Sequence, residues 1–186
     1  KQLILVGKGV TQDTGGVDVK VGGAMVGMKK DCGGAAAAAG IVASCGHLQP
    51  RGIRVTAYLA LVRNSVGAEA YTCDEVITTR SGARVLVINT DAEGRMAMCS
   101  LLCRAREEYL AARAAGKASE DVDVHTLATL TGHAFLAFGA YGALCPNGPA
   151  ARAGSDARIY EAGMRVGDPF ERSSIRREDW KMIAPK

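Results

Sequence analysis

The chain has 186 residues, which is enough for one domain with its own hydrophobic core. Hydrophobic residues make up 48% and charged residues 23%, as in an ordinary soluble globular protein, and no run of about 18 apolar residues indicates a membrane span. The net charge is +4, and the basic residues are scattered along the chain, which argues against nucleic-acid binding. No membrane partner is expected.

Short apolar runs alternate with helical stretches along the chain, with glycine-rich breaks between them. Strands that alternate with helices favour an α/β fold with a mostly parallel central sheet, covered by helices on both faces in a three-layer, phosphorylase/hydrolase-like sandwich. In chain order we expect strands at 2–6, 53–62, 84–88, 122–130 and 141–145, and helices at 32–45, 95–115 and 155–166.

Polar residues follow several of the predicted strands. Lys8 lies in a Gly7-Lys8-Gly9 turn expected after the first strand, residues 91–95 follow the third, and residues 129–132 follow the fourth. Ligands gather at the carboxyl ends of strands in parallel sheets. These segments are therefore expected to contribute to one site.

Four carboxylates in these regions suggest a metal site. Asp91 and Glu93 alternate along the chain, so both would point the same way on extended backbone. If Asp13 and Asp31 join them, four negative charges meet, and two divalent cations would neutralise them. Each carboxylate taken alone is more often a surface residue, a salt-bridge partner or a helix cap, and Asp31 is well placed to cap the helix at 32–45.

Six cysteines are present, and none forms a C-x-x-C pair. Cys99 and Cys103 would share one helix face, but a zinc site there would need further ligands. Buried free thiols are the more common arrangement, and they are typical of a reducing compartment.

Three ordered motifs resemble the leucyl aminopeptidase family, the M17 type of metallopeptidase. The family signature Asn-Thr-Asp-Ala-Glu-Gly-Arg stands complete at 89–95. Upstream, the chain matches the family pattern at 6–11, at 13–16, at Lys20, Met28 and Asp31, and at 33–36. The third landmark is Ala128-Thr129-Leu130-Thr131-Gly132. Motifs of this length and order are highly specific.

The resemblance implies two divalent metal ions, Zn, Mn or Mg. The tight metal would be held by Lys8, Asp13, Asp31 and Glu93, and the exchangeable metal by Asp13, Asp91 and Glu93. Lys8 would have to bind as a neutral amine, because an ammonium group has no lone pair.

The resemblance also implies the catalytic and substrate-binding residues. Lys20 would polarise the scissile carbonyl, and Arg95 would hold a bicarbonate ion that acts as general base towards a metal-bridging water. The substrate would be a peptide with a free N-terminal amine. The residues expected to line the substrate site are Lys20, Met28, Asn89, Thr129, Leu130 and Gly132; Met28 is as well explained as a core residue.

Further expectations follow from the resemblance. Gln12, Ser100 and His133 depart from the family pattern, and none of them is an expected ligand. Residues 1–186 would form an incomplete metallopeptidase catalytic domain, without the N-terminal domain and the C-terminal part that family members have. The protein is expected to be cytoplasmic and a homo-hexamer.

Two functions remain open on the sequence. The first is an active di-metal aminopeptidase, and the second is a catalytically silent relative that acts as a structural or assembly subunit. Silent relatives usually lose metal ligands, whereas each expected ligand position is filled here, which favours the enzyme.

Overall fold

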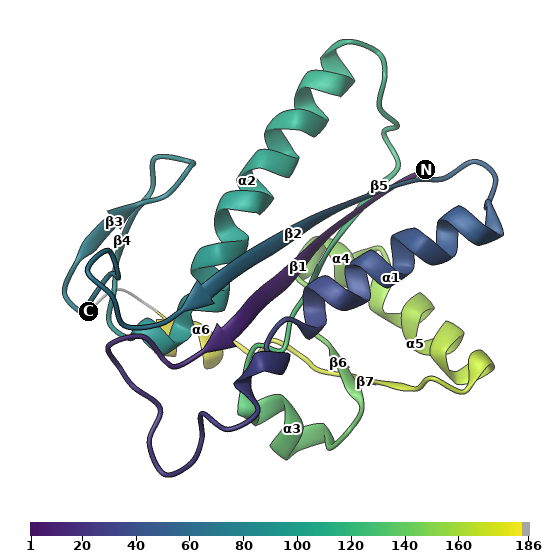
Figure 1. Cartoon of the computed structure of the whole chain (residues 1–186). Helices are drawn as coiled ribbons and strands as arrows, with labels where there is room; N and C mark the ends of the chain where they lie inside the picture. Colours follow the sequence, from purple (N-terminus) through teal and green to yellow (C-terminus); the bar gives the residue numbers. More distant parts are fainter. Residues whose placement is uncertain (184–186) are drawn as a thin grey trace. The chain divides into compact units, whose positions relative to one another are not determined.

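The computed structural model of the chain describes residues 1–183 (Figure 1). They form two compact units, the first spanning Lys1–Leu130 and the second beginning at Thr131. The first unit contains the parallel sheet and all but one of the residues expected in the site.

The first unit is built around a parallel sheet and two long helices. In chain order its elements are β1 (Gln2–Asp13), η1 (Met28–Lys30), α1 (Gly33–Leu48), β2 (Arg54–Asn64), β3 (Val76–Thr78), β4 (Arg84–Leu86), η2 (Thr90–Ala92), α2 (Glu93–Ala114) and β5 (Val122–Leu127). The sheet has the order β2-β1-β5. The central strand β1 is an almost continuous apolar run because both of its faces are covered.

The two long helices lie on opposite faces of the sheet (Figure 1), with α1 against all three strands and α2 against β1 and β2. Successive residues of a strand point to opposite faces. Gly7 and Gly9 accordingly lie against α1, while Val6 packs with Ala60 and Met98 in a small core on the α2 side. The predicted α/β arrangement, with helices on both faces of a parallel sheet, is confirmed.

The strand β1 is longer than predicted, and Gly7-Lys8-Gly9 is not a turn. The strand continues to Asp13. A Cβ atom on Gly7 would lie 2.6 Å from the Cα of Ala35 in α1, and one on Gly9 would lie 3.0 Å from the Cβ of Ala35. These glycines are needed because the helix approaches the strand closely, not because the chain turns. Lys8 therefore lies within the strand.

The predicted strand at 84–88 does not join the parallel sheet, so that expectation was wrong. Its observed part, β4, pairs antiparallel with β3 as a separate two-stranded sheet. Only residues 79–83 separate the two strands, and Gly82 adopts a left-handed φ of 82° in the turn. A connection this short permits a hairpin, whereas a parallel pairing needs a crossover of about a dozen residues.

The second unit consists of short elements around one longer helix. They are α3 (Gly132–Phe138), β6 (Gly142–Leu144), α4 (Gly148–Arg152), α5 (Ser155–Val166), β7 (Phe170–Arg172) and α6 (Asp179–Ile183). The predicted helix at 155–166 is confirmed as α5. Strands β6 and β7 pair in parallel, and the Arg172 guanidinium donates to Asp156 Oδ2 at 2.7 Å, which ties β7 to the start of α5.

All six cysteines are free, as expected, but none is buried, so that part of the expectation was wrong. The Cys103 thiol donates to Glu107 Oε1 at 3.2 Å on the same helix, which gives no support to a zinc pair with Cys99. Within residues 1–183, no helix combines the length and the apolar character required to cross a bilayer.

The contact between α1 and the sheet can be tested at Gly34, where a Cβ atom would lie 1.9 Å from the Leu127 carbonyl oxygen. We expect Gly34→Ala to lower the free energy of unfolding by about 1–3 kcal/mol, because the helix must move off the sheet. Urea denaturation followed by circular dichroism measures the change. Gly46→Ala, in the same helix with open space around the Cβ position, is the matched control and should stabilise by about 0.5–1 kcal/mol. Equal stability of the two variants would refute this account.

Candidate metal centre

Four carboxylates and two lysines from separate elements meet beside the carboxyl end of β1. They are Lys8 and Asp13 of β1, Lys20 of the following loop, Asp31 between η1 and α1, Asp91 of η2, and Glu93 at the start of α2. Four negative and two positive charges leave the group with two excess negative charges. Such an arrangement inside a protein favours the binding of further cations.

Lys8 lies between two of the carboxylates. Its side chain is only 4% exposed, and its Nζ is 2.8 Å from both Asp31 Oδ2 and Glu93 Oε1. Nζ also donates to the Thr129 carbonyl oxygen at 3.2 Å. Burial by itself would lower the pKa of Lys8, but the two carboxylates outweigh it and raise the pKa above its ordinary value. Without a metal ion, Lys8 is therefore an ammonium group that partly neutralises the site.

Lys20 occupies the corresponding place between the other two carboxylates. Its Nζ lies 2.9 Å from Asp13 Oδ2 and also forms an ion pair with Asp91 Oδ1. The loop is held in place because the Lys20 backbone N–H donates to the Thr14 carbonyl oxygen at 2.9 Å. Burial lowers the pKa of Lys20, but Asp91 and Asp13 more than offset this effect, so the pKa is raised.

Two of the carboxylates have opposite pKa shifts although both are buried. For Asp13, burial raises the pKa, but donors on Lys20, Gly15 and Asn64 outweigh it and lower the pKa below its ordinary value. For Glu93, burial again raises the pKa, and Lys8 does not offset it, so the pKa stays raised. The difference follows from the number of donors that each carboxylate has.

The donor set fits divalent cations. One oxygen from each of Asp13, Asp91 and Glu93 lies within 4.8 Å of the others, which is close enough to share an ion. Asp31 Oδ2 and Glu93 Oε1 are buried and within ion-pair distance of Lys8, yet neither accepts a hydrogen bond of normal geometry. Buried oxygens in this state are the ligands that hard or borderline cations prefer.

The local backbone differs from the extended conformation predicted around Asp91 and Glu93. Residues 90–92 form the 3-10 helix η2, and Glu93 is the first residue of α2. Asn89 caps η2, because its side-chain oxygen accepts from the Asp91 N–H at 2.7 Å. The helical start still brings the Asp91 and Glu93 carboxylates together, by a tight turn instead of strand alternation.

Asp31 is not the helix cap that the sequence suggested. The N-cap of α1 is Cys32, without a side-chain hydrogen bond, and Asp31 ends η1. Its Oδ1 accepts a hydrogen bond from the Thr129 hydroxyl at 2.7 Å, and its Oδ2 forms an ion pair with Lys8. The carboxylate therefore points towards the site. The ion pair with Lys8, and not a hydrogen bond to the N-terminus of α1, therefore sets the orientation of the Asp31 carboxylate.

The remaining predicted site residues are placed as follows. Arg95 is exposed, and its side chain forms no hydrogen bond or ion pair with any described residue. Met28 begins η1 and is half-buried, and Leu130 is 38% exposed. Thr129 touches Asp31 and Lys8 directly, as given above, while Gly132 begins α3 in the second unit.

Sequence reasoning missed a group of neutral residues beneath the carboxylates. Thr90 is completely buried, and its backbone carbonyl accepts from Asn64 at 3.1 Å and from the Tyr71 hydroxyl at 3.0 Å. Its N–H donates to Asp18 Oδ2 at 2.8 Å. Asn64 ends β2 beside the end of β1, so the strand-end rule that selected the charged residues would also have selected Asn64.

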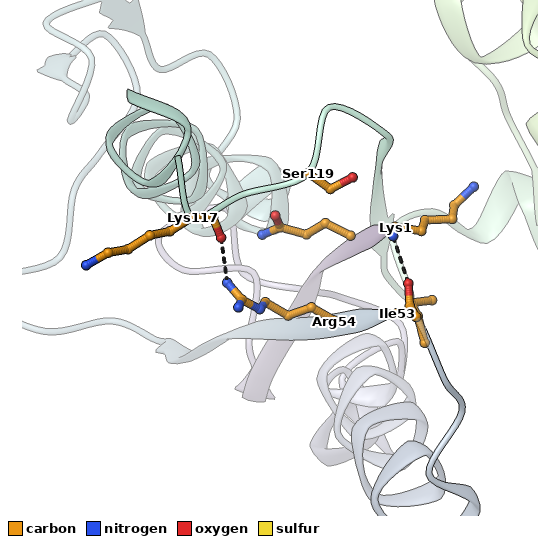
Figure 2. Close-up of a pocket in the computed structure, with 7 residues that line it drawn as sticks. Lys1, Ile53, Arg54, Lys117 and Ser119 are labelled. Carbon is orange, nitrogen blue, oxygen red and sulfur yellow. Dashed lines mark hydrogen bonds between the residues drawn. The ribbon is translucent and has the colours of Figure 1, made fainter. Parts of the chain in front are cut away.

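A separate pocket of about 350 Å³ lies at the opposite end of the sheet (Figure 2). Arg54 Nη1 donates to the Lys117 carbonyl oxygen across it at 3.2 Å, and the seven residues that line it include no carboxylate. This pocket lacks metal ligands and lies away from the charged cluster.

The support that Thr129 gives to Asp31 can be tested in the metal-free protein. Thr129→Val keeps the side-chain shape but removes the donor to Asp31 Oδ1, leaving an oxygen of a buried carboxylate without that partner. We expect the free energy of unfolding in urea to fall by about 1–3 kcal/mol. Thr11→Val is the matched control, because the exposed Thr11 hydroxyl donates only to a backbone carbonyl, and it should change stability by less than about 0.5 kcal/mol. A Thr129→Val protein as stable as this control would argue against the support.

Comparison with known proteins identifies relatives of the whole chain. The model of the cytosol aminopeptidase family, catalytic domain, matches residues 1–184. A putative aminopeptidase of Caenorhabditis elegans is 46% identical over 178 residues, covering 96% of this chain and 33% of the relative. A probable cytosol aminopeptidase of Exiguobacterium sibiricum is 39% identical over 137 residues, covering 74% of this chain and 26% of the relative.

Solved structures agree with these matches. The leucyl aminopeptidase of Trypanosoma brucei in complex with bestatin superposes with a TM-score of 0.84 at 30% identity, covering 100% of this chain and 34% of that one. The bottromycin maturation enzyme BotP in complex with Mn gives a TM-score of 0.81 at 30% identity, covering 99% of this chain and 38% of that one. The chain thus spans about a quarter to a third of the length of the two curated relatives, and 34% and 38% of the two solved chains. With a family match over nearly all of its residues, the chain belongs to the cytosol aminopeptidase family, in the region of the catalytic domain.

Proposed function

We propose that the protein is a metal-dependent aminopeptidase that hydrolyses the N-terminal peptide bond of peptides with a free amine. The observation that carries this proposal is the meeting of four carboxylates and two lysines beside the end of β1. Membership of the cytosol aminopeptidase family supports it, as does the Mn complex of a structural relative.

The metal-binding residues in this proposal are the four carboxylates of the cluster and the lysine buried between two of them. They are Lys8, Asp13, Asp31, Asp91 and Glu93, and they would hold two divalent ions, Zn, Mn or Mg. Bound ions of this kind act as Lewis acids on a carbonyl oxygen and lower the pKa of bound water. Lys8 contributes as a neutral amine, so it gives up the proton that it carries between Asp31 and Glu93 in the metal-free site.

Two cationic side chains are assigned to the reaction itself. Lys20 lies at the edge of the cluster with its side chain 15% exposed, where its ammonium group would bind the carbonyl oxygen of the scissile bond and stabilise developing negative charge. Arg95, exposed and without an ion pair among the described residues, has a guanidinium free to hold an anion. We assign bicarbonate to this position, as the base that accepts and returns a proton.

The substrate site is proposed from the same region. Met28, Asn89, Thr129 and Leu130 of the first unit are assigned to the binding of the first residue of the peptide. For Gly132, in the second unit, this role remains a prediction from the family resemblance. A free amine requirement would make the protein an exopeptidase. Assembly into a homo-hexamer, residence in the cytoplasm and the role of residues 1–186 as part of a larger catalytic domain remain predictions from the family resemblance.

The decisive experiment is hydrolysis of leucine amide by the intact protein with added Mn²⁺ or Zn²⁺. We expect turnover with metal, loss of turnover after removal of metal by a chelator, and recovery when the ion is restored. Asp91→Ala should be inactive, because it removes a ligand whose side chain is a third exposed and whose loss leaves the core intact. An intact protein that binds metal and yet releases no leucine would favour the structural-subunit alternative.

The assignment of Lys20 makes a separate prediction. Lys20→Ala should keep metal affinity at the wild-type level or higher, because it removes an ammonium group that competes for Asp13 and Asp91. Its kcat should fall by a factor of about 10²–10³, because a donor to the developing oxyanion is lost. Calorimetry measures the first quantity and steady-state kinetics the second. Lys30→Ala, an exposed lysine of η1, serves as control, and weaker metal binding by Lys20→Ala would contradict the assigned role.

A further inference from the structure

The side chain of Asn64 lies between the two halves of the charged cluster. Its Nδ2 is 2.9 Å from Asp13 Oδ1, 3.3 Å from Glu93 Oε2 and 3.1 Å from the Thr90 carbonyl oxygen. The residue is only 5% exposed. An amide nitrogen has two hydrogens, so at least two of the three acceptors share one of them.

The chemistry of the neighbours fixes the orientation of this amide. All three groups around Nδ2 are oxygens that accept hydrogen bonds, and two of them belong to carboxylates. An amide rotated by 180° would place its own oxygen against these three acceptors and would remove the Asn64 donor from each of them. Asn64 therefore acts as a donor towards the cluster.

Each carboxylate that Asn64 holds divides its two oxygens in the same way. Asp13 uses Oδ1 for Asn64 and turns Oδ2 towards Lys20. Glu93 uses Oε2 for Asn64 and turns Oε1 towards Lys8. One neutral side chain thus contacts one oxygen of each carboxylate, with the Gly15 N–H as a second donor to Asp13 Oδ1. The other oxygen of each carboxylate faces an ammonium group, that of Lys20 or Lys8.

Asn64 is itself rigidly mounted. It ends β2 in register with Asp13, and its carbonyl oxygen accepts from the Thr14 N–H at 2.9 Å and from the Thr14 hydroxyl at 3.0 Å. The backbone of Gly16, with a φ of 69°, closes over it so tightly that a Cβ there would lie 2.9 Å from Asn64 Oδ1. This close approach limits the movement of the Asn64 amide on the side of Gly16.

We propose that Asn64 is a positioning residue that sets the spacing and direction of the Asp13 and Glu93 carboxylates for two cations. A neutral donor suits this task, because it orients two anions without cancelling their charge, whereas another lysine would compete with the metal ions. The amide also does not titrate, so it stays a hydrogen-bond donor to both carboxylates at any pH at which the protein is folded. This role rests on the proposed metal-dependent function, and it acts through the ligands and not through contact with substrate.

The test compares Asn64→Leu, which keeps the branched shape but removes the donor, with Asn64→Ala and with the wild type. Asn147→Leu is the matched control, because the Asn147 side chain accepts from the Ala150 N–H as the cap of α4 in the second unit. Mn²⁺ affinity is measured by calorimetry, the spectrum of bound Mn²⁺ by electron paramagnetic resonance, and folding of the metal-free proteins by circular dichroism and thermal unfolding. We expect Mn²⁺ binding to weaken by about 10–100-fold in both Asn64 variants, with a changed spectrum, and to stay unchanged in Asn147→Leu.

The outcomes separate this role from a purely structural one. If either Asn64 variant is folded and binds Mn²⁺ with wild-type affinity and spectrum, the positioning role is overturned, even if its thermal stability is lower. A wild-type protein that binds Mn²⁺ but does not hydrolyse leucine amide would overturn the proposed function alone. Failure of the wild type to bind any of Mn²⁺, Zn²⁺ and Mg²⁺ would overturn both.

Discussion

The first unit holds four carboxylates close together in a mostly buried space, and this is the main electrostatic constraint on its structure. Like charges at such distances repel, and burial removes the water that would screen them. Lys8 and Lys20 relieve part of this repulsion, each between a different pair of carboxylates. The remaining excess of negative charge is the physical reason why the site is suited to divalent cations.

Close packing of α1 against the parallel sheet brings the Asp31 carboxylate to the other three. Gly7 and Gly9 in β1 and Gly34 in α1 leave no room for side chains between helix and sheet. Because α1 begins against β1, Asp31, two residues before the start of α1, reaches Lys8 in the middle of the strand. The glycines that looked like turn residues are thus a condition for the geometry of the site.

Beneath the charged residues lies a neutral network that couples distant parts of the chain. Thr90 joins the loop that contains Asp18 to Asn64 at the end of β2 and to Tyr71 in the segment after it. A hydrogen-bonded network of this kind limits the orientations that the carboxylates can adopt, and an unpaired buried group within it would be costly. In the proposed function, the excess negative charge would attract the cations, and this network would keep their ligands aligned.

The sequence by itself determined which residues bear the charge, the alternation of strands and helices, the helix at 155–166 and the family resemblance. Those features depend on residue type, local periodicity and ordered motifs, all of which are present in the linear chain. Tertiary structure alone decided that Gly7-Lys8-Gly9 lies within a strand, that β4 pairs with β3 and that Asp31 faces Lys8 rather than capping α1. It also decided that Asn64 stands between Asp13 and Glu93. The β3–β4 hairpin follows from its short connection. The other outcomes rest on contacts between residues tens of positions apart, which leave no periodic signal along the chain.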